Sequence, residues 1–409
     1  MNLSPTPLRL LPALLSFGML AFVASCQKSV PGDNGGGATG ASVKINSVFP
    51  TKAKVGDTLT ARGTNLPTDR SVIHFWVNKT EAPIILATPD SIKALVPKMA
   101  GSGAVSITVG NSEYKGPAVT YEYAVAVSTL SGTGAVGSFD GDPSTATYNC
   151  PWGLANDLNG DLLVAESYGR VIRRVRLADG FATSITIPTM PGGQFFFSPN
   201  DIAVDPVSGS WFLTDFNKHI LRRDPDGTMN VIYQDSMAMS GIVVSPDGKN
   251  LYISNNTTGA ILKMDLNGQN VSQIASLVTP RNLVFDATSG HLYGVGYPGP
   301  VYDVFATPVP LQVFTSFPGF QGWEFAILKN GDIVLADHFV NKVFLWQKGT
   351  DTVITLAGTG DAADVDGPGL QASFNGPQGI VLGSDGNIYI STYNYDTKGG
   401  NKIRKITLN

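Results

Sequence analysis

The feature that most constrains this chain is a repeat that occurs six times between residues 151 and 380. Each copy contains a four-residue motif whose last position is apolar. The copies are Pro151-Trp152-Gly153-Leu154, Pro199-Asn200-Asp201-Ile202, Met239-Ser240-Gly241-Ile242, Pro280-Arg281-Asn282-Leu283, Gly322-Trp323-Glu324-Phe325 and Pro377-Gln378-Gly379-Ile380. The third positions are 48, 40, 41, 42 and 55 residues apart. Units of about this length that hold several short strands are typical of β-propeller blades, so the sequence predicts a six-bladed propeller.

The two ends of the repeat region indicate how the ring closes. Residues 127–130 form a predicted strand before the first unit, whereas the last unit ends after its third strand, near Leu408. An unpaired strand edge is a liability because it can pair with another chain. We therefore expect the amino-terminal strand to complete the last blade.

Two related segments lie beside this closure. Residues 129–154 read TLSGTGAVGSFDGDPSTATYNCPWGL, and residues 355–380 read TLAGTGDAADVDGPGLQASFNGPQGI. Together with the six units they resemble NHL repeats, and the resemblance covers residues 127–409. The fourth unit departs from the pattern, since Gly294-Val295-Gly296-Tyr297-Pro298 replaces an acidic turn, and we expect an irregular blade there.

Residues 43–123 contain short runs of alternating apolar and polar residues separated by Gly, Pro and Asn. Such runs are typical of a β-sandwich. The motifs Val55-Gly56-Asp57, Gly63-Thr64-Asn65-Leu66 and GSGAVSITVGN resemble the IPT/TIG family of immunoglobulin-like domains. That resemblance implies a spacer or interaction module. The predicted fold class is all-β: a small immunoglobulin-like sandwich followed by the propeller at 127–409.

The first 25 residues have the pattern of a signal peptide. An apolar run from Leu10 to Ala24 follows Arg9 and is short for a membrane span. The run ends in Val23-Ala24-Ser25-Cys26, which resembles the bacterial lipobox and implies a lipid on Cys26 that holds the protein on a membrane. Residues 26–42 are expected to form a flexible tether. The predicted location is the cell envelope, as an outer-membrane lipoprotein, with periplasmic and cell-surface orientations both open.

Charge and cysteine content exclude several function classes. The chain carries 28 Lys and Arg against 32 Asp and Glu, a formal charge of -4, so it offers no basic field to a nucleic-acid backbone. Cys150 is the one thiol besides Cys26, and a lone Cys beside Pro is expected to be packed. The sequence contains no nucleophile elbow, phosphate-binding loop or dinucleotide fingerprint. We predict no catalytic residue.

In a propeller, the loop before each innermost strand and the loop between the second and third strands are expected on one face. Here these loops combine aromatic rings with amides and carboxylates. Sugars need that combination, because their C–H faces stack on rings and their hydroxyls need polar partners. Each side chain could also be structural, as a turn cap or as packing between blades. The predicted ligand-binding residues are Trp152, Tyr168, Asn200, Asp215, Asn255, Trp323, Glu324, Asp337, His338 and Tyr393.

The order of lipid anchor, IPT/TIG domain and propeller resembles accessory lipoproteins of Gram-negative glycan-uptake systems. It implies non-catalytic capture of polysaccharide, with the membrane as a second partner through Cys26. One alternative is an envelope scaffold that binds protein. Another alternative is a hydrolase similar to calcium-dependent lactonases. Of these hypotheses it alone needs a cofactor, Ca²⁺. It implies a Ca²⁺ cage from Glu166 or Glu324, Asn200 or Asn255, and Asp215 or Asp337. A similar zinc-dependent lyase is disfavoured, since His338 is the one histidine on the predicted face.

Overall fold

A computed structural model describes residues 42–409, apart from 186, 188–197, 216–217, 308 and 315–320. The predicted signal peptide, Cys26 and the tether up to residue 41 lie outside the described residues. The described chain is all-β, as predicted, with 34 strands and one 3-10 turn, Gly369–Gln371. Within this part of the chain, no helix has the length and apolar character needed to cross a membrane.

Two sheets at the amino-terminal end share one apolar core. Leu59, Phe75, Ile92 and Ile107 are fully buried in it. The first sheet consists, in spatial order, of β1 (Lys44–Phe49), β3 (Thr58–Thr64), β7 (Ser91–Leu95) and β6 (Ile84–Thr88). The second consists of β2 (Lys52–Ala53), β9 (Ser112–Tyr121), β8 (Gly103–Val109), β4 (Ile73–Val77) and β5 (Thr80–Ala82).

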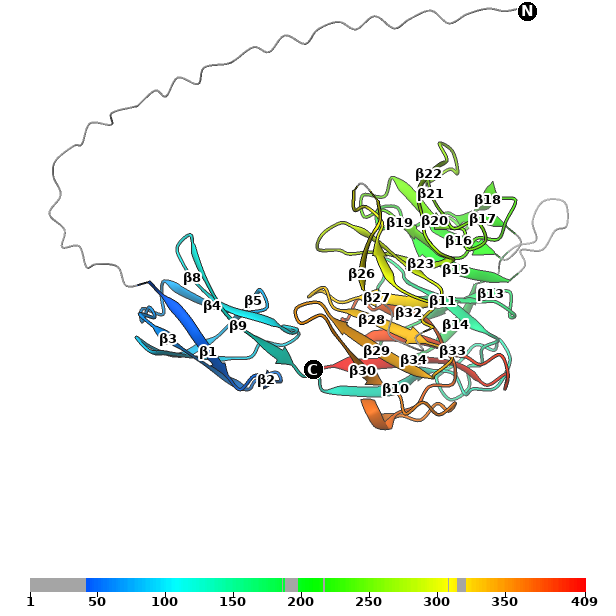
Figure 1. The fold of residues 1–409 in the computed structure, drawn as a ribbon. Helices are drawn as coiled ribbons and strands as arrows, with labels where there is room; N and C mark the ends of the chain where they lie inside the picture. Colours follow the sequence, from blue (N-terminus) through cyan, green and yellow to red (C-terminus); the bar gives the residue numbers. More distant parts are fainter. Residues whose placement is uncertain (1–41, 186, 188–197, 216–217, 308, 315–320) are drawn as a thin grey trace, which may run out of the picture. The chain divides into compact units, whose positions relative to one another are not determined.

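Six further sheets, numbered here in chain order, follow along the described chain (Figure 1). Sheet 1 holds β11 (Pro151–Asn156), β12 (Leu162–Glu166), β13 (Val171–Val175) and β14 (Ala182–Ile185). Sheet 2 holds β15 (Pro199–Val204), β16 (Trp211–Asp215), β17 (His219–Arg223) and β18 (Met229–Gln234). Sheet 3 holds β19 (Ile242–Val244), β20 (Asn250–Ser254), β21 (Ala260–Asp265) and β22 (Ser272–Ser276).

Sheets 4 and 5 repeat this order, and sheet 6 takes strands from both ends of the repeat region. Sheet 4 holds β23 (Pro280–Phe285), β24 (Leu292–Gly296), β25 (Val301–Asp303) and β26 (Leu311–Phe314). Sheet 5 holds β27 (Glu324–Ile327), β28 (Ile333–Asp337), β29 (Lys342–Gln347) and β30 (Thr352–Ala357). Sheet 6 holds β32 (Pro377–Leu382), β33 (Ile388–Tyr393), β34 (Gly400–Leu408), β10 (Val125–Ser131) and β31 (Gly367–Pro368). Sheet 4 keeps the common strand order, and its third strand, β25, is three residues long.

The innermost strands join these sheets into a ring. β11 contacts β15, and the series continues through β19, β23, β27 and β32 back to β11. Where the ring returns to its start, the Ser391 hydroxyl accepts a hydrogen bond from the Gly379 amide (3.0 Å) and donates one to the Trp152 carbonyl (2.7 Å). Thr214 and Ser254 make the same two bonds toward sheets 3 and 4.

The predicted closing strand is present. β10 pairs antiparallel with β34, with Val127 opposite Ile406, and Figure 1 shows the teal β10 beside the red β34. Val127 and Ile406 are buried in one core with side chains of sheets 5 and 6. The amino-terminal strand therefore covers the edge that β34 would otherwise expose.

Candidate binding face

Eight ring-bearing side chains from sheets 1, 4, 5 and 6 form one connected network, which we call the aromatic cluster. Trp323 lies at its centre: it stacks on Trp152, with ring centroids 5.3 Å apart, and on His338 at 5.6 Å. Tyr168 reaches the cluster through Tyr393, at 5.7 Å. The members are Trp152, Tyr168, Tyr297, Trp323, His338, Phe339, Tyr393 and Tyr395.

The cluster draws on the two loop types that were expected to share a face. Trp323 precedes β27, whereas His338 and Tyr297 follow the second strands of sheets 5 and 4. Their ring contacts bring these loops together. The shared face is therefore confirmed for these loops.

Two third positions of the repeat, Asp201 and Glu324, place carboxyl groups in the lining of a central cavity that Trp152 and Trp323 also line. Asp201 accepts hydrogen bonds from the amides of Ile202 (2.8 Å) and Ile242 (3.0 Å). Glu324 accepts from the amide of Ile380 (3.1 Å) and from the Trp152 indole. Burial raises the pKa of both carboxyl groups, and the Asp201 charge raises the pKa of Glu324 further.

The central cavity is too small for a sugar. The volume open to the centre of a water molecule is about 10 Å³, which is room for about one water. A sugar ligand can therefore rest against the aromatic cluster but cannot enter the ring. The cavity is lined by Trp152, Asn200, Asp201, Ser240, Gly241, Arg281, Trp323 and Glu324.

The structure separates the ten predicted binding residues into two groups. Tyr168 is 49% exposed and Trp323 is half-buried, so both can be touched by a ligand. The other eight are buried: Trp152, Asn200, Asp215, Asn255, Glu324, Asp337, His338 and Tyr393. Trp152, His338 and Tyr393 are members of the aromatic cluster and support its accessible rings from below.

Three of the buried predictions cap turns in their own sheets. Asp215 accepts from the His219 amide (2.8 Å), and Asn255 accepts from the Thr258 amide (3.0 Å). Asp337 accepts from the amides of Gln321, Phe339 and Val340, at 2.9, 3.0 and 3.3 Å. These three side chains therefore act as turn caps, which was the structural alternative to ligand binding.

The Ca²⁺ cage does not fit these side chains. Glu166 is fully buried and accepts hydrogen bonds from Arg173 (2.8 Å) and Ser138 (2.6 Å). Of the six proposed ligands, Asn200 and Glu324 line the central cavity, whereas the other four do not. The described residues hold no group of three or more His, Cys, Asp and Glu side chains that could bind a metal. Cys150 is buried, as expected, and burial raises the pKa of its thiol.

The sequence-based site omitted four residues that the structure brings to this face. Phe339 (51% exposed) and Tyr395 belong to the aromatic cluster, as does Tyr297. The Arg281 guanidinium lies over the rings of Trp323 (4.9 Å) and Tyr297 (5.4 Å). Arg281 holds the second position of its motif, as do Trp152 and Trp323, and this shared position was the available signal.

Comparison with known proteins supports both parts of the fold. Residues 43–123 match the family model of the IPT/TIG domain, which confirms that domain. Protein SUPPRESSOR OF QUENCHING 1 of Arabidopsis thaliana, a chloroplastic protein, is 24% identical over 308 residues, which are 68% of this chain. The chain spans 27% of the length of that relative.

Solved structures from Bacteroides share the fold over 90% of this chain and 98% of theirs. A structural-genomics protein of unknown function from Bacteroides thetaiotaomicron is 20% identical, with a TM-score of 0.61. An auxiliary nutrient binding protein from Bacteroides ovatus and a putative phosphatase from Bacteroides thetaiotaomicron are each 18% identical, with TM-scores of 0.56. At these identities the likeness establishes that the chain is similar to them in fold.

Proposed function

We propose that this protein is an outer-membrane lipoprotein, anchored through Cys26, that captures glycan without making or breaking a bond. Its residues 127–409 would act as a six-bladed NHL-type propeller, with the immunoglobulin-like IPT/TIG domain as a spacer. The observation that carries the proposal is the aromatic cluster, which presents Tyr168, Trp323 and Phe339 on one face. The auxiliary nutrient binding protein of similar fold supports a binding role.

The chemistry of the face favours capture over catalysis. Flat rings stack on the apolar faces of sugars, and each such contact removes apolar surface from water. Several weak contacts along a polymer add up through multivalency. A shallow face of this kind suits retention of a long chain better than enclosure of a small molecule.

Affinity electrophoresis tests the proposal. Full-length protein in detergent would run through gels that contain single polysaccharides, alongside Trp323→Ala and Tyr168→Ala variants. Phe139→Ala is the matched control, because Phe139 is 71% exposed and lies outside the aromatic cluster. We expect retention of the wild type and of Phe139→Ala, and reduced retention of the two cluster variants.

The protein scaffold and the calcium-dependent hydrolase predict different results for the same protein preparation. Well-folded protein that no glycan retains would overturn glycan capture and favour the protein scaffold. Turnover of a substrate that chelator abolishes would favour the calcium-dependent hydrolase. Intact mass of the mature protein tests the anchor, since an amino terminus other than an acylated Cys26 would contradict it.

A further inference from the structure

Arg281 carries a guanidinium without an anionic partner among the described residues. It is half-buried, and its Nε is fully covered yet makes no hydrogen bond. Its two terminal nitrogens are not fully covered and make no hydrogen bond or ion pair to a described residue. Burial lowers the pKa of Arg281, and the titratable groups acting on it are the hydroxyls of Tyr297 and Tyr395.

This situation differs from that of the fully buried arginines of the ring. Arg173 pairs with Glu166 (2.8 Å) and Arg404 pairs with Asp364 (2.8 Å). A buried cation that lacks such a partner is costly, and contact with the rings of Trp323 and Tyr297 offsets part of that cost. Arg281 therefore keeps its charge at this face without an internal carboxylate.

The segments between residues 186 and 320 that the structure does not describe cannot supply the missing anion. They comprise residues 186, 188–197, 216–217, 308 and 315–320, and their sequence contains no Asp or Glu. The one acidic residue elsewhere in the undescribed part of the chain is Asp33, in the predicted tether. The terminal nitrogens of Arg281 are not fully covered, so they can be reached by an anion from outside the described residues.

A second donor lies beside the guanidinium. The Trp323 indole Nε1–H is covered and has no hydrogen-bond partner among the described residues, and the Trp323 ring is the one on which Arg281 stacks. The rings of Trp323 and Tyr297 and the terminal nitrogens of Arg281 belong to the face proposed for glycan, whereas the covered Trp323 Nε1–H does not reach it. A sugar that stacks on this cluster would hold its substituents within reach of a planar cation.

We propose that the glycan captured at this face is acidic, and that Arg281 binds its anionic group while Trp323 holds the sugar ring. This inference rests on the proposed function and narrows it to one substrate class. A guanidinium forms paired hydrogen bonds with the oxygens of a carboxylate, and it also binds sulfate. Carboxylated and sulfated polymers share this chemistry, so both are probes.

The test uses full-length protein in detergent and gels of four polymers. Polygalacturonate and its fully methyl-esterified form share a backbone and differ in charge, dextran sulfate is the sulfated probe, and dextran is its neutral match. The variants are Arg281→Gln and Arg281→Lys, with Arg223→Gln as control. Arg223 also lies over an aromatic ring, that of Trp211 at 4.4 Å, but in sheet 2 and outside the aromatic cluster.

We expect retention on polygalacturonate or dextran sulfate to exceed that on the neutral match by about tenfold or more, the range of charge-assisted hydrogen bonds. Arg281→Gln should remove that difference, Arg281→Lys should keep part of it, and Arg223→Gln should keep all of it. The probe that is retained identifies the anionic group. Thermal unfolding of each variant would verify that it is folded.

Equal retention of charged and neutral polymers, unchanged in Arg281→Gln, would overturn the acidic ligand and leave glycan capture standing. Loss of neutral and charged retention together in a folded Arg281→Gln protein would also overturn it, since Arg281 would then only position Trp323. Absence of retention on every polymer would overturn glycan capture itself.

Discussion

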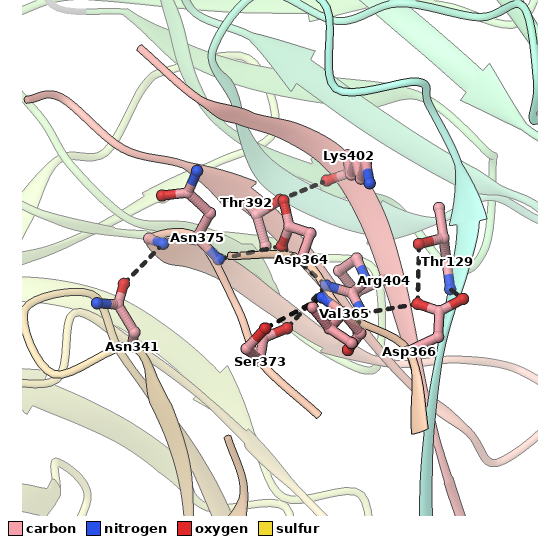
Figure 2. A network of polar contacts seen from close by, with 11 residues as sticks. Thr129, Asn341, Asp364, Val365, Asp366, Ser373, Asn375, Thr392, Lys402 and Arg404 are labelled. Carbon is pink, nitrogen blue, oxygen red and sulfur yellow. Dashed lines mark hydrogen bonds and ion pairs between the residues drawn. The ribbon is translucent and has the colours of Figure 1, made fainter. Parts of the chain in front are cut away.

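Arg173 and Arg404 are equivalent residues of the first and last sheets, and each is fully buried against two carboxylates and two backbone carbonyls. Arg173 contacts residues of the segment 129–154, and Arg404 contacts residues of the related segment 355–380. Figure 2 shows the network around Arg404. The acceptors of Arg173 are Phe139 O, Thr147 O, Asp140 and Glu166, and those of Arg404 are Val365 O, Ser373 O, Asp366 and Asp364.

The two networks place one carboxylate differently. In sheet 1, Ser138 of the long segment donates to Glu166 of β12 (2.6 Å). In sheet 6, the aligned position of Ser138 is Asp364, and Thr392 of β33 donates to it (3.4 Å). The hydroxyl lies on the long segment and the carboxylate on the second strand in sheet 1, and the reverse holds in sheet 6. In both sheets the carboxylate pairs with the arginine guanidinium. Both arrangements fasten a long loop to the third strand of its sheet.

Replacement of Arg404 should destabilise the ring strongly. Arg404→Met leaves Asp364 buried without its cation and two carbonyls without a donor, and breaking a buried pair costs about 3–5 kcal/mol. Urea unfolding followed by fluorescence measures the loss. Arg176→Met is the control, because Arg176 and Asp179 form an exposed pair, and it should leave the midpoint unchanged. Equal midpoints for both variants would contradict the role given to Arg404.

The exchange of hydroxyl and carboxylate predicts a rescue. Glu166→Thr should lower stability, because the half-exposed Asp140 is then the one carboxylate left to the buried Arg173. Adding Ser138→Asp recreates the arrangement of sheet 6 and should recover part of the loss. A coupling of about 0.5–3 kcal/mol in the double-mutant cycle is the expected size. Purely additive effects would show that the two networks are not interchangeable.

Closure of the ring between sheets 6 and 1 depends on a glycine. A Cβ at Gly379 would lie 2.1 Å from the Trp152 carbonyl oxygen, so the innermost strands could not approach. We expect Gly379→Ala to lower the free energy of unfolding by about 1–3 kcal/mol, as overpacking does. In Gly294→Ala the nearest neighbours of the new Cβ are side-chain methyl groups of Leu277, Leu283 and Val304, at 3.0, 3.1 and 3.5 Å. A Gly294→Ala loss as large as that of Gly379→Ala would argue against this account.

The carboxyls of Asp201 and Glu324 predict a pH dependence of stability. Burial raises the pKa of both in the folded protein, so above about pH 4 the folded state holds more protons than the unfolded state. Their contribution to stability is therefore complete at low pH and is lost as pH rises through the folded pKa values. Asp201→Asn removes one of the two groups and their mutual repulsion. The decline of the urea midpoint between pH 4 and 8 should become shallower in this variant, and an unchanged slope would refute the prediction.

The repeat pattern predicted much of the described fold, because it reports local chemistry. Alternating apolar positions made the strands, and turn residues separated them, so the closing pair of Val127 and Ile406 could be expected from where the repeats begin and end. The same local chemistry misled the choice of site residues. Asp215 and Asp337 follow second strands in the manner of binding residues, yet they hold amides of their own loops.

The sequence by itself determined the six units, their order and the strand that closes the last sheet, since each depends on neighbours along the chain. Only the tertiary structure decided which second-position side chains can be touched. Trp152 and Trp323 hold the same position in their motifs, but stacking between sheets 1 and 5 buries the first and leaves the second half-buried. Only the structure likewise shows that the Arg281 guanidinium lies over Trp323 with no hydrogen bond or ion pair to a carboxylate among the described residues. The exposure of the two tryptophans and the lack of an ion-pair partner for Arg281 arise from contacts between distant repeats. The pattern within one repeat does not encode such contacts.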